Sequence, residues 1–150
     1  AGRDTLLWAL EADVVSEINA RHANTPFLPG VPLDIGLRAT GVLADIAACD
    51  VVLMVAPAQH VRTIAAQLAP HLPRGKPVVI CAKGLEQSTG KLMGEVMAEA
   101  LPHATQAVLS GPSFAADVAR GLPAAVTIAT ADETLGAVSL AGGPSCVNLK

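Results

Sequence analysis

The chain has few aromatic and few charged residues, and these shortages exclude several kinds of binding surface. Only Trp8, Phe27 and Phe114 are aromatic, and tyrosine is absent. Proteins that bind single-stranded nucleic acid stack bases on aromatic side chains, which this chain hardly offers. Lysine and arginine are scattered without forming a run, and the net charge is −3. A nucleic-acid groove needs a clustered basic face, so we expect no nucleic-acid partner.

Paired cysteines, long apolar runs and a leader sequence are equally lacking. The three cysteines, Cys49, Cys81 and Cys146, are far apart and form no C-x-x-C pair. An odd number of isolated cysteines indicates free thiols in a reducing compartment rather than a disulfide framework. No apolar run is long enough to cross a membrane. The opening "AGRDTLLW" lacks the basic-then-apolar plan of a signal peptide. These absences predict a cytoplasmic protein without a membrane segment.

Several motifs of catalysis and cofactor binding are also missing. G-x-S-x-G, which marks a nucleophilic serine, does not occur. The four histidines show no metal-ligand spacing, so we expect no metal site. G-x-G-x-x-G, the loop that binds the pyrophosphate of a dinucleotide, is absent too.

What the chain does contain is an alternation of strand-like and helix-like segments. Half of its 150 residues are hydrophobic, which suits one domain with a real core. Strands are expected at residues 4–9, 36–40, 51–56, 77–82, 106–111 and 124–129, and helices at 13–22, 42–49, 60–72, 91–101 and 112–121. This alternation predicts an α/β fold with a parallel sheet and helices on both faces. Thr40 is expected to cap helix 42–49.

Polar and glycine residues follow three of the expected strands directly. Gln59 follows the strand at 51–56, Lys83 and Gly84 follow the strand at 77–82, and residues 110–113 end the strand at 106–111. Ligands of open parallel sheets bind beyond the carboxyl ends of the strands. We therefore expect these residues to converge on a site for an anion. The alternative is that Lys83 simply leaves the sheet for water.

Two further positions invite a functional interpretation. In "LSGPSFA", Gly111 permits close backbone approach and Ser113 lies in the first turn of a helix, where free N–H groups favour a phosphate or carboxylate. An ordinary strand-to-helix turn with a serine cap is an equally good explanation. Glu11 follows the strand at 4–9, where an acidic residue can bind the ribose of a dinucleotide. An exposed charge near a helix start is the simpler alternative.

Longer blocks of the sequence resemble a known family. The blocks "LLW", "INARHANTPFLPGVPL", "APAQHVR", "AKGLEQSTGKLMGEVMAEALP" and "AVLSGPSFAADVARGLPAAVTIA" extend over about residues 5–130. In this order and spacing the chain resembles bacterial NAD(P)-dependent glycerol-3-phosphate dehydrogenase. The combination of "KGLE" with "SGPSFA" is specific to this resemblance, whereas ketopantoate and 6-phosphogluconate reductases share only the sheet.

The resemblance implies a function and a set of ligand-binding residues. Members of the family interconvert sn-glycerol 3-phosphate and dihydroxyacetone phosphate with NAD or NADP, for phospholipid synthesis, and are often homodimers. Lys83 is expected to contact both substrate and cofactor, Gly111 and Ser113 the substrate, and Ala115 the cofactor. Glu11 is the candidate for the ribose of NAD, and Leu10 stands about where the family has Arg or His for the 2′-phosphate of NADP.

The sequence also departs from the family, which shapes the expected fold. The resemblance implies a Rossmann-type sheet whose first strand and glycine-rich loop are missing, so that its two flanking strands have unpaired edges. We expect residues 1–134 to form a partial NAD(P)-binding domain and residues 135–150 to diverge from the family. The catalytic domain and its lysine are not in this sequence, so no catalytic residue is assigned and the chain alone is expected to be inactive. A non-catalytic nucleotide- or phosphate-binding module, or a subunit-interaction module, is the alternative function.

Overall fold

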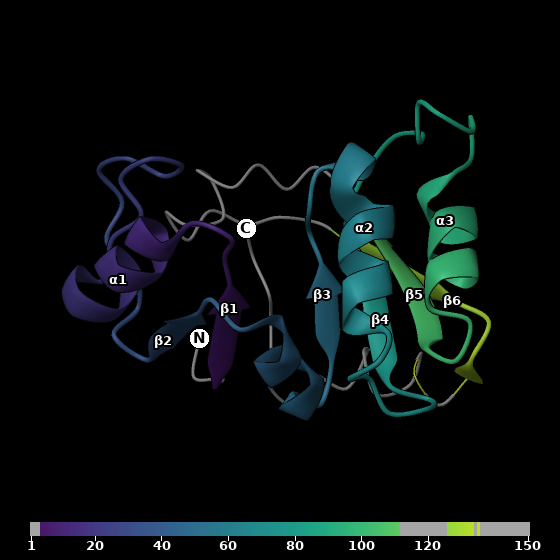
Figure 1. Ribbon diagram of the computed structural model, residues 1–150, viewed down its shortest axis with the longest axis horizontal. Coiled ribbons are helices and arrows are strands. Elements are labelled where there is room, and N and C mark those ends of the chain that lie inside the picture. The colour runs from purple at the N-terminus through teal and green to yellow at the C-terminus, as the bar shows by residue number, and fades with distance from the viewer. Residues whose placement is uncertain (1–3, 112–125, 134, 136–150) are drawn as a thin grey trace.

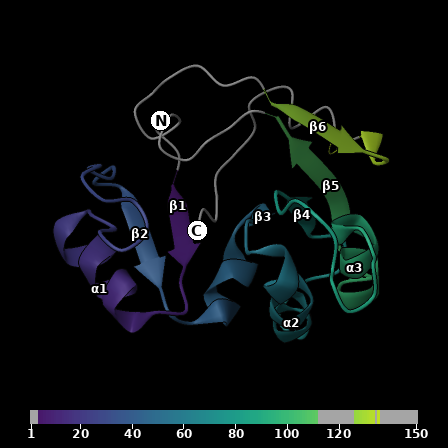
Figure 2. The same ribbon diagram turned by 90° about the horizontal axis from the view of Figure 1, so that it is seen from above.

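The chain folds into an α/β structure with two neighbouring sheets (Figures 1 and 2). The computed structural model describes residues 4–111, 126–133 and 135. The smaller sheet pairs β1 (Thr5–Trp8) with β2 (Leu37–Thr40), and the larger has the order β3 (Val52–Met54), β4 (Pro77–Ile80), β5 (Thr105–Ser110), β6 (Thr127–Thr130). The helices are α1 (Ala12–Arg21), α2 (Ala58–Leu68), α3 (Met93–Ala100) and the 3₁₀ helix η1 (Leu43–Ala48). The expected helix at 112–121 lies outside the described residues, as does residue 134 and the tail beyond residue 135.

The direction of the last strand differs from the expectation. The pairs β1–β2, β3–β4 and β4–β5 are parallel, as predicted. β6 instead runs antiparallel to β5, with Ser110 opposite Thr127. The prediction of a parallel strand at 124–129 was therefore wrong in direction, because the apolar pattern of a strand does not record where the chain re-enters the sheet.

The largest core lies between the four-stranded sheet and the helices α2 and α3. Val61, Ala65 and Leu68 recur at helical spacing on α2 and are buried. They pack in one cluster with Met54 and Ile80 of the sheet. Residues on the other face of this sheet form a small separate cluster around Val79 and Ala107. The alternating sides of the strands thus supply two different apolar layers.

Strand β1 shows that helices cover both faces of the fold. Leu7 packs with Val14 and Ile18 of α1. Its neighbour Trp8 points to the opposite face and joins the large cluster that contains Met54. α1 and the pair α2–α3 therefore lie on opposite faces, as the sequence predicted.

β1 and β3 are the strands of the two sheets that lie nearest each other in Figure 2, and Trp8 of β1 shares a core cluster with Met54 of β3. No ladder joins these two strands in the described part of the chain. A small hollow there is lined by residues of β1, η1, β3 and α2, among them Trp8, Ile46, Met54 and Ile64. The unpaired edges expected for two central strands stay a prediction.

The short connection before β3 corrects a second expectation. The segment at 42–49 is a 3₁₀ helix whose N-cap is Val42, so Thr40 is not its cap. The Thr40 hydroxyl instead accepts a hydrogen bond from the Val42 N–H at 3.0 Å and donates one to Asp45 at 2.7 Å. Thr40 is the last residue of β2, and its side chain closes the turn rather than the helix.

Among residues 4–111, 126–133 and 135, no helix has the length and apolar character needed to span a bilayer.

Candidate functional site

The candidate site lies at the carboxyl ends of β3, β4 and β5. The ladders pair Met54 with Ile80, and Ile80 with Val108. Ile80 and Val108 are paired with each other in the parallel ladder. Lys83 comes three residues after Ile80, and Gly111 comes three residues after Val108. The chain therefore leaves both strands at the same edge of the sheet. The predicted convergence of these strand ends is therefore what the topology produces. Ser113 and Ala115 lie outside the described residues.

The backbone around Lys83 is held against the neighbouring strand and helix. The N–H groups of Cys81 and Ala82 both donate to the carbonyl of Met54, at 2.9 and 3.2 Å. Gly84 follows with a φ of 109°, a conformation that favours glycine. A Cβ atom on Gly84 would lie 3.9 Å from the Cβ of Ala58, the first residue of α2. Lys83 itself is exposed, so its ammonium group is open to a ligand.

Cys81 lies beside this lysine at the end of β4. Burial raises the pKa of the Cys81 thiol, and the positive charge of Lys83 acts in the opposite direction. The thiol therefore stays protonated near neutral pH and behaves as a half-buried apolar side chain. It supports the base of the site without contributing a charge.

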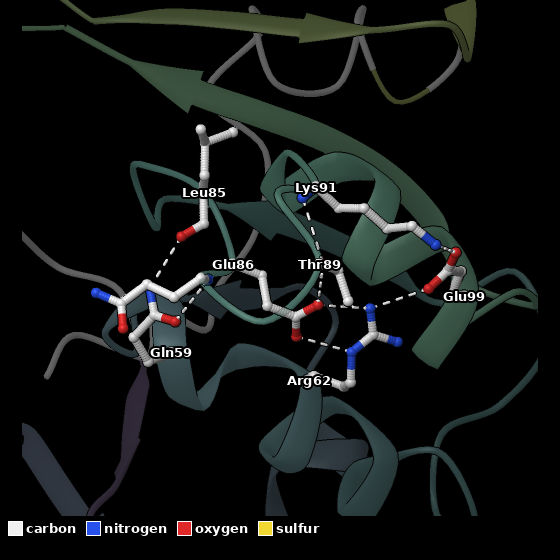
Figure 3. Close-up of polar contacts among 8 residues, drawn as sticks. Gln59, Arg62, Leu85, Glu86, Thr89, Lys91 and Glu99 are labelled. Atoms are coloured by element: carbon white, nitrogen blue, oxygen red, sulfur yellow. Dashed lines mark hydrogen bonds and ion pairs between the residues drawn. The ribbon is translucent and has the colours of Figure 1, made fainter.

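Gln59 fastens the segment that follows Lys83. Its side-chain N–H₂ donates to the carbonyl of Leu85 at 2.9 Å, and its side-chain oxygen accepts the N–H of Gln87 at 2.9 Å (Figure 3). One amide thus satisfies both a donor and an acceptor of the loop backbone. Gln59 was expected at this edge from its place after β3, and the structure brings it to the Lys83 loop.

A buried carboxylate lies on the other side of the same loop. Glu86 is only 5% exposed, and its two oxygens accept hydrogen bonds from Nε and Nη2 of Arg62 at 2.8 and 2.9 Å. The Thr89 hydroxyl donates a further bond to it at 2.5 Å. The bonds from Arg62, and then that from Thr89, hold the pKa of Glu86 at about 2. Such a bidentate, fully paired carboxylate is ionised at any physiological pH.

The ion pair extends to helix α3. Arg62 also contacts Glu99 at 2.9 Å, and Glu99 in turn pairs with Lys91, so that the loop at 85–91 is fastened to two helices (Figure 3). The sequence analysis missed this cluster. The sequence offered one indication of the cluster, which is that Arg62 is a lone arginine on an otherwise neutral helix. Its partner Glu86 lies 24 positions further along the chain, and the sequence alone does not show that the two residues meet.

Glu11 follows a strand of the two-stranded sheet, whereas Lys83 follows a strand of the four-stranded sheet. Glu11 is the N-cap residue of α1, three residues after the end of β1, and is half-buried. Its neighbour Leu10 is 74% exposed. The place of Glu11 at the carboxyl end of a parallel strand is the one from which an acidic residue can reach a ribose.

The order of the strands identifies the class of protein. Open parallel sheets crossed by helices on both faces, with the site at the strand ends, define a dinucleotide-binding domain of the Rossmann type. In agreement, the structure matches a crystal structure of glycerol-3-phosphate dehydrogenase from Coxiella burnetii with a TM-score of 0.81 and 28% identity, over 95% of this chain and 45% of that one. It also matches a ketopantoate reductase from Ralstonia eutropha with a TM-score of 0.62, and at 16% identity this likeness shows the fold alone.

The sequence comparison is more specific than the fold. Residues 1–136 match the family described as NAD-dependent glycerol-3-phosphate dehydrogenase N-terminus, and the chain belongs to this family. It is 59% identical over 135 residues to the glycerol-3-phosphate dehydrogenase [NAD(P)+] of Parvibaculum lavamentivorans, and 58% identical over 136 residues to that of Paramagnetospirillum magneticum. The two matches include 90% and 91% of this chain, and 40% and 50% of the length of the two relatives.

Proposed function

We propose that the chain forms the cofactor- and substrate-binding part of an enzyme that interconverts sn-glycerol 3-phosphate and dihydroxyacetone phosphate with NAD or NADP. The observation that carries this proposal is the family membership over residues 1–136. The convergence of the Gln59, Lys83 and Gly111 segments at one sheet edge supports it, because that edge is where such folds bind their ligands.

Lys83 is the central residue of the proposed site. Lys83 is exposed, and Gly84 directly after it lies against Ala58, the first residue of α2. The substrate carries a phosphate and the cofactor a pyrophosphate, and a lysine at this edge attracts both. We propose that Lys83 contacts substrate and cofactor, that Gly111 and Ser113 hold the substrate, and that Ala115 contacts the cofactor. Glu11 is the proposed ribose ligand.

The described residues fit a nicotinamide dinucleotide in their chemistry. They combine a cation at the carboxyl edge, glycines with positive φ at 84 and 111, and an acidic residue after β1. A bound nicotinamide would supply the hydride acceptor for oxidation of the C2 hydroxyl of glycerol 3-phosphate to a ketone. The residues of this chain would contribute the orientation of the ligands and a positive charge beside them. The chain spans half or less of the length of these two relatives, so the activity of a whole enzyme is part of the proposal.

Calorimetric titration of the chain with NADH and with glycerol 3-phosphate tests the proposal. We expect both to bind, and Lys83→Gln to weaken the binding of glycerol 3-phosphate by about tenfold or more, the usual effect of losing a charge-assisted hydrogen bond. Arg74→Gln is the matched control, because Arg74 is an exposed cation at the opposite end of β4. It should leave the affinity within about twofold. Absence of any binding would instead favour the subunit-interaction module.

The proposal extends to assembly and cellular role. No ladder joins β1 to β3 in the described residues. We propose a homodimer as the state of the chain, and sedimentation analysis of the pure chain measures it. A monomer at all concentrations would contradict this part. A cytoplasmic role in phospholipid synthesis follows from the proposed reaction.

A further inference from the structure

The loop between β4 and α3 is closed on itself and anchored at both ends. Its backbone closes through the N–H of Glu86 to the carbonyl of Lys91 at 2.9 Å, the N–H of Gly90 to the carbonyl of Glu86 at 2.8 Å, and a bridge between Leu85 and Leu92. Side chains of α2 and α3 hold its outer surface. A loop with so many internal and external hydrogen bonds keeps one conformation.

Lys83 and Gly84 lie between two fixed points of this structure. On one side, the N–H of Ala82 is bonded to the carbonyl of Met54 in β3. On the other, the carbonyl of Leu85 is bonded to Gln59 of α2. Only two residues separate these anchors, so the path of the Lys83 backbone is set by hydrogen bonds to β3 and α2.

The Arg62–Glu86 pair fixes the same loop one residue further on. Glu86 is the one buried charged residue in the described part of the chain, and both its oxygens are bonded to Arg62. Breaking a paired, buried carboxylate leaves the partner group without compensation, so the pair resists local opening. Figure 3 shows Gln59 and Arg62 approaching the loop from the same helix, side by side.

We propose that Gln59 and the Arg62–Glu86 pair are positioning residues that hold Lys83 and Gly84 in the geometry needed to bind the phosphorylated substrate. They act through the backbone of the loop and do not contact the ligand. The inference rests on the proposed function of Lys83, and it assigns these three side chains a role in affinity that is additional to folding.

The first arm of the test requires no ligand. Hydrogen–deuterium exchange of the chain should show that Gln59→Ala and Glu86→Gln each speed exchange at the hydrogen-bonded amides of Glu86 and Gly90 by about tenfold or more, while amides of β3 to β5 are unchanged. Gln67→Ala is the matched control, because Gln67 is exposed near the other end of α2. Unchanged exchange at Glu86 and Gly90 in both variants would overturn the proposal.

The second arm separates positioning from a merely structural role. Glycerol 3-phosphate should bind Gln59→Ala about tenfold more weakly than the unaltered chain, with the thermal unfolding midpoint of the four-stranded region nearly unchanged. If Gln59 acts through Lys83, the double variant Gln59→Ala/Lys83→Gln should bind no more weakly than Lys83→Gln alone. Additive losses would overturn the proposal, since Gln59 would then act elsewhere.

The two arms also distinguish failure of the inference from failure of the proposed function. If the unaltered chain binds neither NADH nor glycerol 3-phosphate, the proposed function fails. The role of Gln59, Arg62 and Glu86 in positioning Lys83 is then decided by the exchange arm alone, in which faster exchange at the amides of Glu86 and Gly90 supports it and unchanged exchange refutes it.

Discussion

The two sheets of this protein are stabilised by different means. The four-stranded sheet packs with α2 and α3 in a cluster of fifteen buried residues of the described chain, whereas the two-stranded sheet and α1 share a cluster of five. The smaller region compensates with polar contacts to its edge strand. Asn19 of α1 donates to the carbonyl of Ala39 at 2.9 Å and accepts its N–H at 2.8 Å. One amide side chain thereby protects the outer edge of β2 as a further strand would.

The difference between the two sheets shows that an apolar layer and a polar clamp stabilise strands over different distances. The polar clamp is the pair of hydrogen bonds between the Asn19 side chain and the backbone of Ala39. Apolar burial links many elements, so damage to it spreads through the region. A hydrogen bond to one backbone position protects only that position and its neighbours. We expect mutations in the two regions to differ in the size of their effect and in how far it extends.

The largest effect should come from Ile80→Ala in the large cluster. Ile80 is 1% exposed and lies between β3 and β5. Its truncation should lower the free energy of unfolding by about 2–5 kcal/mol, measured by urea denaturation. Ile80→Val is the control, with an expected loss of about 0.5–1.5 kcal/mol. If Ile80→Ala lowered the free energy of unfolding no more than Ile80→Val does, Ile80 would not belong to the large apolar cluster.

Ile18→Ala is the matched truncation in the small region. Ile18 is fully buried between α1 and the two-stranded sheet. We expect faster hydrogen exchange in β1, β2 and α1, with little change in β4 and β5, because Ile18 packs in the small cluster with residues of β1, β2 and α1. Exchange that increases equally in both sheets would show that the two regions unfold as one unit.

Asn19→Ala should have a smaller and more local effect. The variant leaves the N–H and carbonyl of Ala39 without their partner, at a cost of about 1–2 kcal/mol to local opening. Exchange at the Ala39 amide measures this cost. Ser16→Ala, on an exposed position of the same helix, should stay within about 0.5 kcal/mol. Equal exchange at Ala39 in both variants would refute the clamp.

The effect most dependent on pH should come from Glu86→Gln. The Arg62 and Thr89 bonds lower the pKa of Glu86 to about 2 from an ordinary value of 4.5. A depressed pKa means that the ionised pair stabilises the fold fully above about pH 4.5 and progressively less as the pH falls toward 2. The unaltered chain should therefore unfold at a higher temperature than the variant near pH 7, and the gap should narrow below about pH 4.5. A gap that is constant from pH 7 to pH 2 would contradict the pairing.

Much of the site could be predicted from residues that lie next to one another in the sequence. Lys83 and Gly84 directly follow a buried strand, and the carboxyl ends of parallel strands share one edge, so their place followed from local pattern. The Glu86 carboxylate is in the same quoted block, but its burial depends on Arg62, which comes from another helix. The antiparallel direction of β6 and the 3₁₀ form of residues 43–48 were missed for a similar reason, since neither follows from apolar spacing.

By itself, the sequence determined the alternation of strands and helices, the family, and the residues available at the strand ends. These properties depend on side-chain periodicity and on motifs of adjacent residues. Only the tertiary structure decided that α2 holds the loop after β4, that Asn19 protects the edge of β2, and that Trp8 of β1 packs with Met54 of β3. Each of these is a contact between distant segments, and its partner is chosen by packing in space rather than by local pattern.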